Sequence, residues 1–136
     1  MILVIDNFIK DQELLNDIAS DSTFFNDPGV YYWWNGWWNS EARTVKQRLI
    51  DYIWADNCPI TAKFSLMGFE YWTGIQTANT ETGFSNNLGN HYDKDEELFA
   101  QTGEIVRPII GTVYYPEQDQ FEGGMLEVYT EGVDKA

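Results

Sequence analysis

The chain has 136 residues, of which 22 are acidic and 8 are basic, giving a net charge of −14 at neutral pH. This length suits one domain that can bury a hydrophobic core. The negative charge repels phosphate backbones and anionic lipid headgroups, which argues against nucleic-acid and membrane partners. A single cysteine, Cys58, excludes an internal disulfide and predicts a reducing compartment, the cytoplasm.

The first part of the sequence predicts two helices separated by an aromatic loop. The apolar spacing in residues 11–20 predicts the first helix. Residues 21–40 are rich in Asp, Asn, Gly and Trp, which predicts a loop with a turn at Asp27-Pro28-Gly29. The second helix is predicted from Glu41 to Trp54, with Ser40 as its N-cap.

The remaining sequence predicts strands and loops. Aromatic residues bounded by turn residues predict a strand within 64–73, followed by a long loop at 74–90. Residues 94–103 predict a short helical turn. The apolar run 105–115 predicts a strand that is stopped by a proline, and a further strand is predicted after Gly123-Gly124.

The order of these elements, helices before strands, indicates an α+β domain that is mainly β. We expect two N-terminal helices to pack on one face of the sheet. The whole chain is expected to form one domain, with a helical support region at 1–62 and a β-rich core region at 63–136.

The segment His91-Tyr92-Asp93 contains the only histidine of the chain. On an extended strand, residues two apart point to the same side, so this imidazole and carboxylate can act together. They could supply two of the three ligands of the 2-His-1-carboxylate face that binds non-haem Fe(II). The motif is short, and a solvated surface histidine among acidic residues is the alternative.

The order of motifs around this segment resembles the Fe(II)- and 2-oxoglutarate-dependent oxygenases, in their prolyl-hydroxylase-like branch. That family has, in order, a strand with a tyrosine, a loop, His-x-Asp, a β run ending in Tyr-Tyr or Tyr-Leu, and a Gly-Gly-x-Leu strand. Here the same order is met by Tyr71, His91/Asp93, Tyr114-Tyr115 and Gly123-Gly124-Met125-Leu126. The opening Val4-Ile5-Asp6-Asn7-Phe8 is also similar, so the resemblance covers most of residues 2–130.

The resemblance implies a double-stranded β-helix (jelly roll), which we expect to be incomplete in this chain. It also implies an enzyme that hydroxylates an unactivated C–H bond while 2-oxoglutarate is converted to succinate and CO₂. It implies His91 and Asp93 as iron ligands, and Tyr71 and Tyr115 as residues that line the 2-oxoglutarate pocket. Core packing is the alternative for both tyrosines. The implied cofactors are Fe(II) and 2-oxoglutarate, with ascorbate as a further candidate. The implied substrate is a peptidyl, proline-like group or a small molecule.

Two family features have no match in this sequence: a second iron-binding histidine, and an Arg or Lys that pairs with the distal carboxylate of 2-oxoglutarate. The arginines Arg43, Arg48 and Arg107 do not occupy the position of that anchor. Three explanations stay open. The chain is a piece of a longer enzyme, which we favour; or another polypeptide completes it; or it is a degenerate relative that binds without turnover. We expect the chain alone to be inactive or impaired.

An incomplete jelly roll would have open sheet edges, and open edges usually pair or are covered. We therefore expect a homodimer formed through these edges. A monomer found by light scattering at micromolar concentration would contradict this expectation.

Four of the six tryptophans lie within Trp33-Trp34-Asn35-Gly36-Trp37-Trp38. Exposed tryptophans stack on sugar rings and prolines, so Trp34 and Trp37 are candidate substrate-binding residues. The alternative is that alternate tryptophans wedge between the helices and the sheet, with Gly36 at a turn. A second hypothesis for the whole chain is a non-catalytic, aromatic-lined domain that binds carbohydrate or peptide on the same scaffold.

Overall fold

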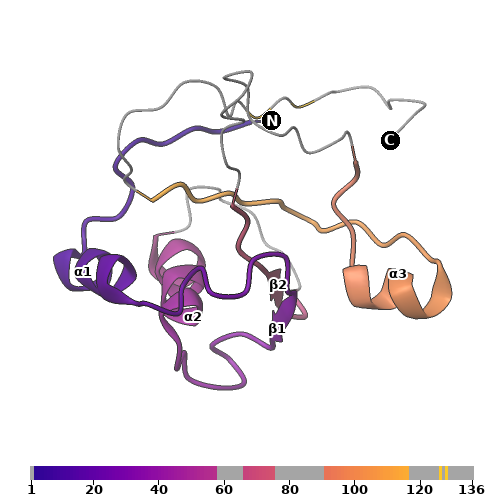
Figure 1. Cartoon of the computed structure of the whole chain (residues 1–136), viewed down its shortest axis with the longest axis horizontal. Coiled ribbons are helices and arrows are strands. Elements are labelled where there is room, and N and C mark those ends of the chain that lie inside the picture. Colours follow the sequence, from indigo (N-terminus) through magenta and orange to yellow (C-terminus); the bar gives the residue numbers. More distant parts are fainter. Residues whose placement is uncertain (1, 58–65, 76–90, 117–125, 127, 129–136) are drawn as a thin grey trace. The chain divides into compact units, whose positions relative to one another are not determined.

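The computed structural model describes residues 2–57, 66–75, 91–116, 126 and 128. The chain divides into two compact units, Met1–Gly74 and Ile75–Ala136. The first unit contains five elements, and the described part of the second contains one helix (Figure 1). In chain order they are α1 (Gln12–Ser20), β1 (Tyr32–Trp34), α2 (Val45–Asp51), the π-helical segment η1 (Tyr52–Asp56), β2 (Phe69–Tyr71) and α3 (Glu96–Thr102).

Helix α1 confirms the first predicted helix. Asp11 is its N-cap, and the Asp11 carboxylate accepts a hydrogen bond of 3.1 Å from the backbone N–H of Leu14. This bond satisfies one of the N–H groups that a helix leaves without a partner in its first turn. Leu14 and Ile18 lie one helical turn apart and are both buried, so α1 contributes one apolar face to the core.

Helix α2 begins four residues later than predicted, because Thr44 and not Ser40 is its N-cap. The Thr44 side chain accepts from the Gln47 backbone N–H at 3.1 Å, and the Gln47 side chain accepts from the Thr44 backbone N–H at 3.5 Å. This reciprocal pair is a capping box. Ser40 has a different role: its hydroxyl accepts a hydrogen bond of 3.1 Å from the indole N–H of Trp34.

Replacing Thr44 with alanine removes half of the capping box, and we expect T44A to lower the free energy of unfolding by about 1 kcal/mol. Urea unfolding followed by far-UV circular dichroism measures this change. S40A is the matched control, because it removes a hydroxyl of the same loop without touching the cap of α2. S40A should alter Trp34 fluorescence and leave the helical signal of the native protein unchanged. A larger helical loss in S40A than in T44A would contradict the assignment.

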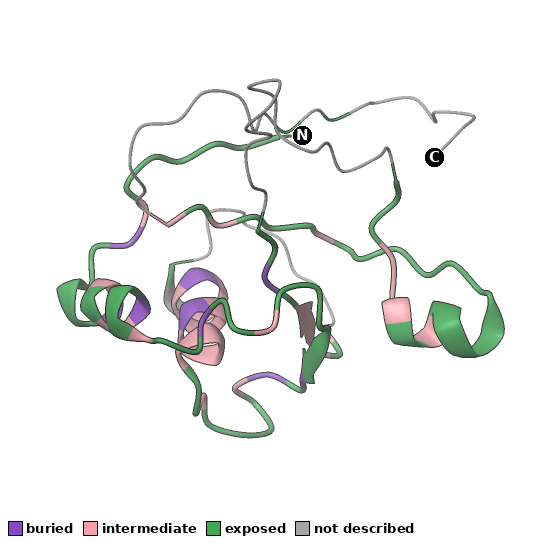
Figure 2. Ribbon diagram, in the orientation of Figure 1, coloured by how far each residue is buried: buried purple, intermediate pink, exposed green. Residues whose placement is uncertain are grey.

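The core of the first unit lies between α1, α2 and the strand pair formed by β1 and β2. Its buried apolar residues come from all of these elements and from the loops beside them (Figure 2). They are Ile9, Leu14, Ile18, Phe24, Trp34, Leu49 and Ile53. An ion pair of 2.6 Å between the Arg48 guanidinium and the Asp17 carboxylate joins α2 to α1, and this hydrogen bond raises the pKa of Arg48.

Strands β1 and β2 form an antiparallel pair in which Tyr32 lies opposite Tyr71, Trp33 opposite Glu70 and Trp34 opposite Phe69. Strand β1 lies inside the segment predicted to be a loop, so that prediction is wrong at residues 32–34. The predicted turn before it is confirmed. Val30 N–H donates to the Asp27 carbonyl at 3.2 Å, and Gly29 has φ +80°, which fits a turn with Pro28 and Gly29 at its centre.

The second unit supports one predicted element and leaves others as predictions. Helix α3 confirms the short helix predicted at 94–103, with Asp95 as N-cap and Gly103 in the left-handed conformation at its C-cap. No residue of 105–116, all of which the structure describes, belongs to an assigned strand, in contrast to the predicted β run. Cys58, most of the 74–90 loop and Gly123-Gly124 lie outside the described residues.

The jelly roll and the single-domain organisation therefore stay predictions. Within the described ranges the sheet has two strands, both in the first unit. The sequence boundary at 62/63 differs from the boundary between the compact units at Gly74, because β2 belongs with the helices. Among the helices of the described ranges, none has the length and apolar character needed to cross a bilayer.

Candidate functional site

His91 and Asp93 lie side by side in the second unit, as their spacing predicted. The distance from His91 Nε2 to Asp93 Oδ1 is 3.5 Å, and the two side chains are 47% and 49% exposed. Residues 91–95 belong to neither a helix nor a strand, so the side chains converge without a regular strand to align them.

The backbone that follows this pair is anchored at the start of α3. The Asp95 carboxylate accepts a hydrogen bond of 2.9 Å from the Leu98 N–H. The Asp95 N–H donates to the carbonyl of Val106 at 2.8 Å, which ties the pair's segment to the segment that follows α3. A Cβ at Gly111 would lie 3.4 Å from Asp93 Oδ2, so this segment also passes close to the carboxylate.

The geometry of the pair fits two neighbouring ligands of one metal ion. Metal–ligand distances of about 2.1 Å place adjacent donors of an octahedral ion about 3 Å apart. The observed separation of the two donor atoms, 3.5 Å, is slightly longer than that value. Across the described ranges, no group of three or more His, Cys, Asp or Glu side chains is placed to hold a metal. Of the residues that the structure describes, only His91 and Asp93 are therefore candidates for a three-residue face, and their role as ligands stays a prediction.

Basic side chains of the second unit lie on aromatic rings. The Arg107 guanidinium carbon is 4.6 Å from the centroid of Tyr92, the residue between the two candidate ligands. The Lys94 ammonium is 4.8 Å from the centroid of Phe99 and 3.1 Å from the Glu96 carboxylate. These cation–π contacts hold positive charge close to the chain segment that carries His91 and Asp93.

The two tyrosines assigned to the 2-oxoglutarate pocket lie in different units, and their role stays a prediction. In the first unit, the Tyr71 hydroxyl accepts from the Gln47 side chain at 3.4 Å, and the Tyr71 ring stacks on Tyr32 with centroids 5.7 Å apart. In the second unit, Tyr115 is exposed. Its neighbour Tyr114 is half-buried, and burial raises the pKa of the Tyr114 hydroxyl.

The candidate substrate-binding tryptophans differ in exposure. Trp34 is only 4% exposed and packs on Phe69 at a centroid distance of 6.0 Å. Trp37 is half-buried and contacts Phe69 at 5.6 Å. Gly36 lies at the turn between them with φ +88°, as predicted. The arrangement matches the wedge alternative for Trp34, and the substrate-binding role of both residues stays a prediction.

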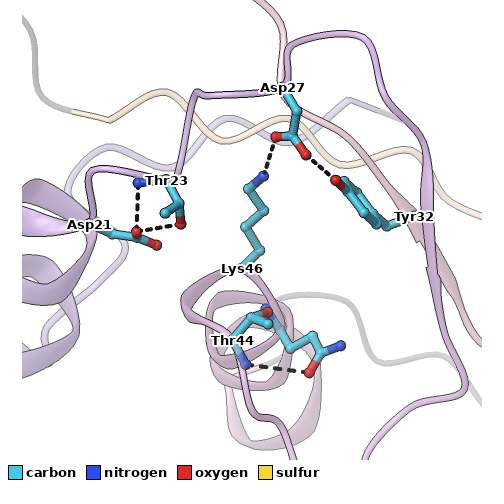
Figure 3. Close-up of polar contacts among 7 residues, drawn as sticks. Asp21, Thr23, Asp27, Tyr32, Thr44 and Lys46 are labelled. Carbon is cyan, nitrogen blue, oxygen red and sulfur yellow. Dashed lines mark hydrogen bonds and ion pairs between the residues drawn. The ribbon is translucent and has the colours of Figure 1, made fainter.

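A polar cluster links the loop before β1 to helix α2 (Figure 3). The Asp27 carboxylate accepts hydrogen bonds from the Tyr32 hydroxyl and from the Lys46 ammonium, the latter at 3.3 Å. The bond from Tyr32 is the main cause of a lowered Asp27 pKa, and the same bond raises the pKa of Tyr32. The Lys46 ammonium also lies 5.8 Å from the centroid of Phe24 and 5.5 Å from that of Tyr32.

This cluster predicts a loss of stability in acid. Because the pKa of Asp27 in the folded protein lies below its ordinary value of 3.8, the stabilisation is complete above that value and is lost as the pH falls through the folded pKa. We expect the free energy of unfolding of the wild type to fall more steeply below pH 4 than that of D27N. Urea titrations at several pH values measure the difference. Parallel curves for the two proteins would contradict the assigned cause.

Four exposed aromatic residues on or beside strands β1 and β2 were not predicted as functional: Tyr31, Tyr32, Trp33 and Trp72. For the first three, the signal that could have found them is the run Tyr31-Tyr32-Trp33-Trp34, whose alternate members face opposite sides where it forms a strand. Treating the whole segment as a loop concealed this alternation.

Comparisons of the chain with protein-family models, with curated proteins and with solved structures found no match.

Proposed function

We propose that the chain is an Fe(II)- and 2-oxoglutarate-dependent dioxygenase-like protein that hydroxylates a peptidyl, proline-like group or a small molecule. The observation that carries this proposal is the 3.5 Å separation of the His91 and Asp93 donor atoms. The order of sequence motifs around the pair supports the same function. An imidazole nitrogen beside a carboxylate oxygen is a donor set that suits Fe(II).

In this proposal, His91 and Asp93 hold the metal from one side and leave its other positions open. Bound Fe(II) would supply the activation of O₂ that the hydroxylation needs. Since His91 is the only histidine of these 136 residues, a second imidazole ligand must come from outside them. Two protein ligands hold a divalent ion weakly, so we expect low metal affinity and little or no turnover from the chain alone.

The single histidine makes the proposal directly testable by NMR, because only one imidazole contributes histidine ring signals. Mn(II), which does not react with O₂ as Fe(II) does, serves as the probe. Titration with Mn(II) should broaden the His91 ring signals at low molar ratios. Adding 2-oxoglutarate should strengthen this effect, because its keto-acid group can occupy two of the open positions.

D93N tests the second ligand, and E104Q is the matched control. Both variants remove one carboxylate charge from the same unit, but Glu104 is exposed and is not part of the pair. D93N should weaken Mn(II) binding roughly tenfold or more, whereas E104Q should bind like the wild type. If Mn(II) affinity fell equally in both variants, the binding would be explained by general electrostatic attraction and not by a specific site. No response to 2-oxoglutarate in the wild type would argue against the oxygenase assignment.

A further inference from the structure

Three exposed aromatic side chains and one carboxylate lie on or beside one face of the β1–β2 strand pair. Trp33 lies opposite Glu70 in the strand pair, so these two residues share one face. Tyr31 and Trp72 lie directly beside the strands, and their rings contact each other. These four residues form the first set. On the opposite face Tyr32 stacks on Tyr71 and the buried Trp34 packs on Phe69, with Tyr32 itself 39% exposed. We call the first set the outer aromatic face.

The aromatic members of this face are large and accessible. Tyr31 is 43% exposed, Trp33 is 49% exposed and Trp72 is 43% exposed. Single exposed apolar residues are common on protein surfaces, but several large exposed aromatic residues on and beside one small sheet indicate an interaction site. Tyrosine and tryptophan are also the residues that contribute most to binding at protein interfaces.

The rings are held in place before any ligand binds. The indole N–H of Trp33 donates to the side-chain oxygen of Asn35 at 2.7 Å. The ring of Trp33 lies against Gly68, where a Cβ would come within 2.8 Å of Trp33 Cε2. Tyr31 and Trp72 contact each other with centroids 5.0 Å apart at an angle of 55°. A ligand that binds such fixed rings loses less free energy to side-chain ordering.

The charge of the chain selects among possible ligands. A net charge of −14, with Glu70 on the face itself, attracts cations and repels anions. Aromatic rings bind ammonium and guanidinium groups over their faces. Such contacts already occur within the chain: Lys46 lies over Tyr32 of β1, and Arg107 lies over Tyr92 in the second unit.

We propose that the outer aromatic face binds a basic peptide, with arginine or lysine side chains of the peptide stacked on Trp33 and on the Tyr31–Trp72 pair, and with Glu70 contributing the complementary charge. This inference does not rest on the metal pair, because every residue of the face belongs to the first unit. It therefore holds whether or not His91 and Asp93 bind a metal.

The experiment is a titration of the full chain with three probes of equal length: a peptide of alternating glycine and arginine, a peptide of alternating glycine and glutamate, and a linear β-glucan oligosaccharide. Isothermal calorimetry gives the affinity, and the indole N–H signals in NMR identify the tryptophans that respond. We expect the arginine peptide alone to bind, with shifts at Trp33 and Trp72. Equal binding of the glutamate peptide or of the oligosaccharide would overturn the proposal.

W33A and W72A should each weaken binding of the arginine peptide roughly fivefold or more, and E70Q should weaken it to a smaller extent. W38A is the matched control, because Trp38 is also exposed but packs on Trp37 and Phe69 away from the outer face. W38A should bind within twofold of the wild type. W33F should retain most of the affinity, which separates loss of the aromatic ring from loss of folding. Equal losses in W38A and W33A, or no loss in either, would overturn the proposal, because binding would then not depend on the outer aromatic face.

Discussion

W34A is expected to lower the free energy of unfolding by about 3–5 kcal/mol, the range typical of removing a large buried aromatic side chain. Trp34 is 4% exposed, and its ring contacts Phe69 from β2 and Trp37 from the following loop. Its indole N–H also donates to Ser40. The substitution therefore leaves a cavity and removes the partner of a hydroxyl group at the same time.

Urea unfolding followed by circular dichroism measures this loss without relying on tryptophan fluorescence. W38A is the control, since Trp38 is 44% exposed and should cost about 1 kcal/mol. W34F tests the hydrogen bond separately: it keeps an aromatic ring in the core but cannot donate to Ser40, so its stability should fall between those of the wild type and W34A. Similar losses in W34A and W38A would show that Trp34 does not anchor the core.

The helices of this chain could be predicted because their signals are local. The apolar spacing of α1 and the Asp11 cap lie within one short segment, and the same is true of Asp95 and Gly103 around α3. The start of α2 was predicted wrongly because Ser40 and Thr44 are both good N-caps. Gln47, three residues after Thr44, decides between them through the capping box.

The pairing of β1 with β2 could not be predicted with the same reasoning. Strand β1 has three residues, fewer than a periodic pattern needs, and its partner β2 lies more than thirty residues away in the sequence. Which face of Tyr31-Tyr32-Trp33-Trp34 is buried depends on that pairing. The exposure of Trp33 and the burial of Trp34 were thus not readable from composition alone.

The proximity of His91 and Asp93, in contrast, could be predicted from the sequence. The spacing of His91 and Asp93 predicted that their side chains would lie together, and the structure places their donor atoms 3.5 Å apart. Short spacing is sufficient here because the chain needs only one intervening residue to bring the two groups to the same side. A third ligand depends on distant segments, and sequence spacing says nothing about it.

The second large effect is expected at Gly68. A Cβ at this position would lie 2.7 Å from the carbonyl oxygen of Trp34, as well as against the ring of Trp33. A side chain can rotate away from such a contact, but the carbonyl is fixed by the pairing of β1 with β2. G68A should therefore separate the strands locally and lower the free energy of unfolding by about 1–3 kcal/mol.

G74A is the matched control on the other side of β2. A Cβ at Gly74 would meet nothing within 4 Å, so the substitution adds no clash. It removes conformational freedom from the unfolded chain, and we expect it to leave stability unchanged or raise it by up to about 1 kcal/mol. The two variants should thus change the free energy of unfolding in opposite directions, or G68A alone should lower it. If both glycines accept alanine equally well, the close approach of the Gly68 backbone to β1 is not required for folding.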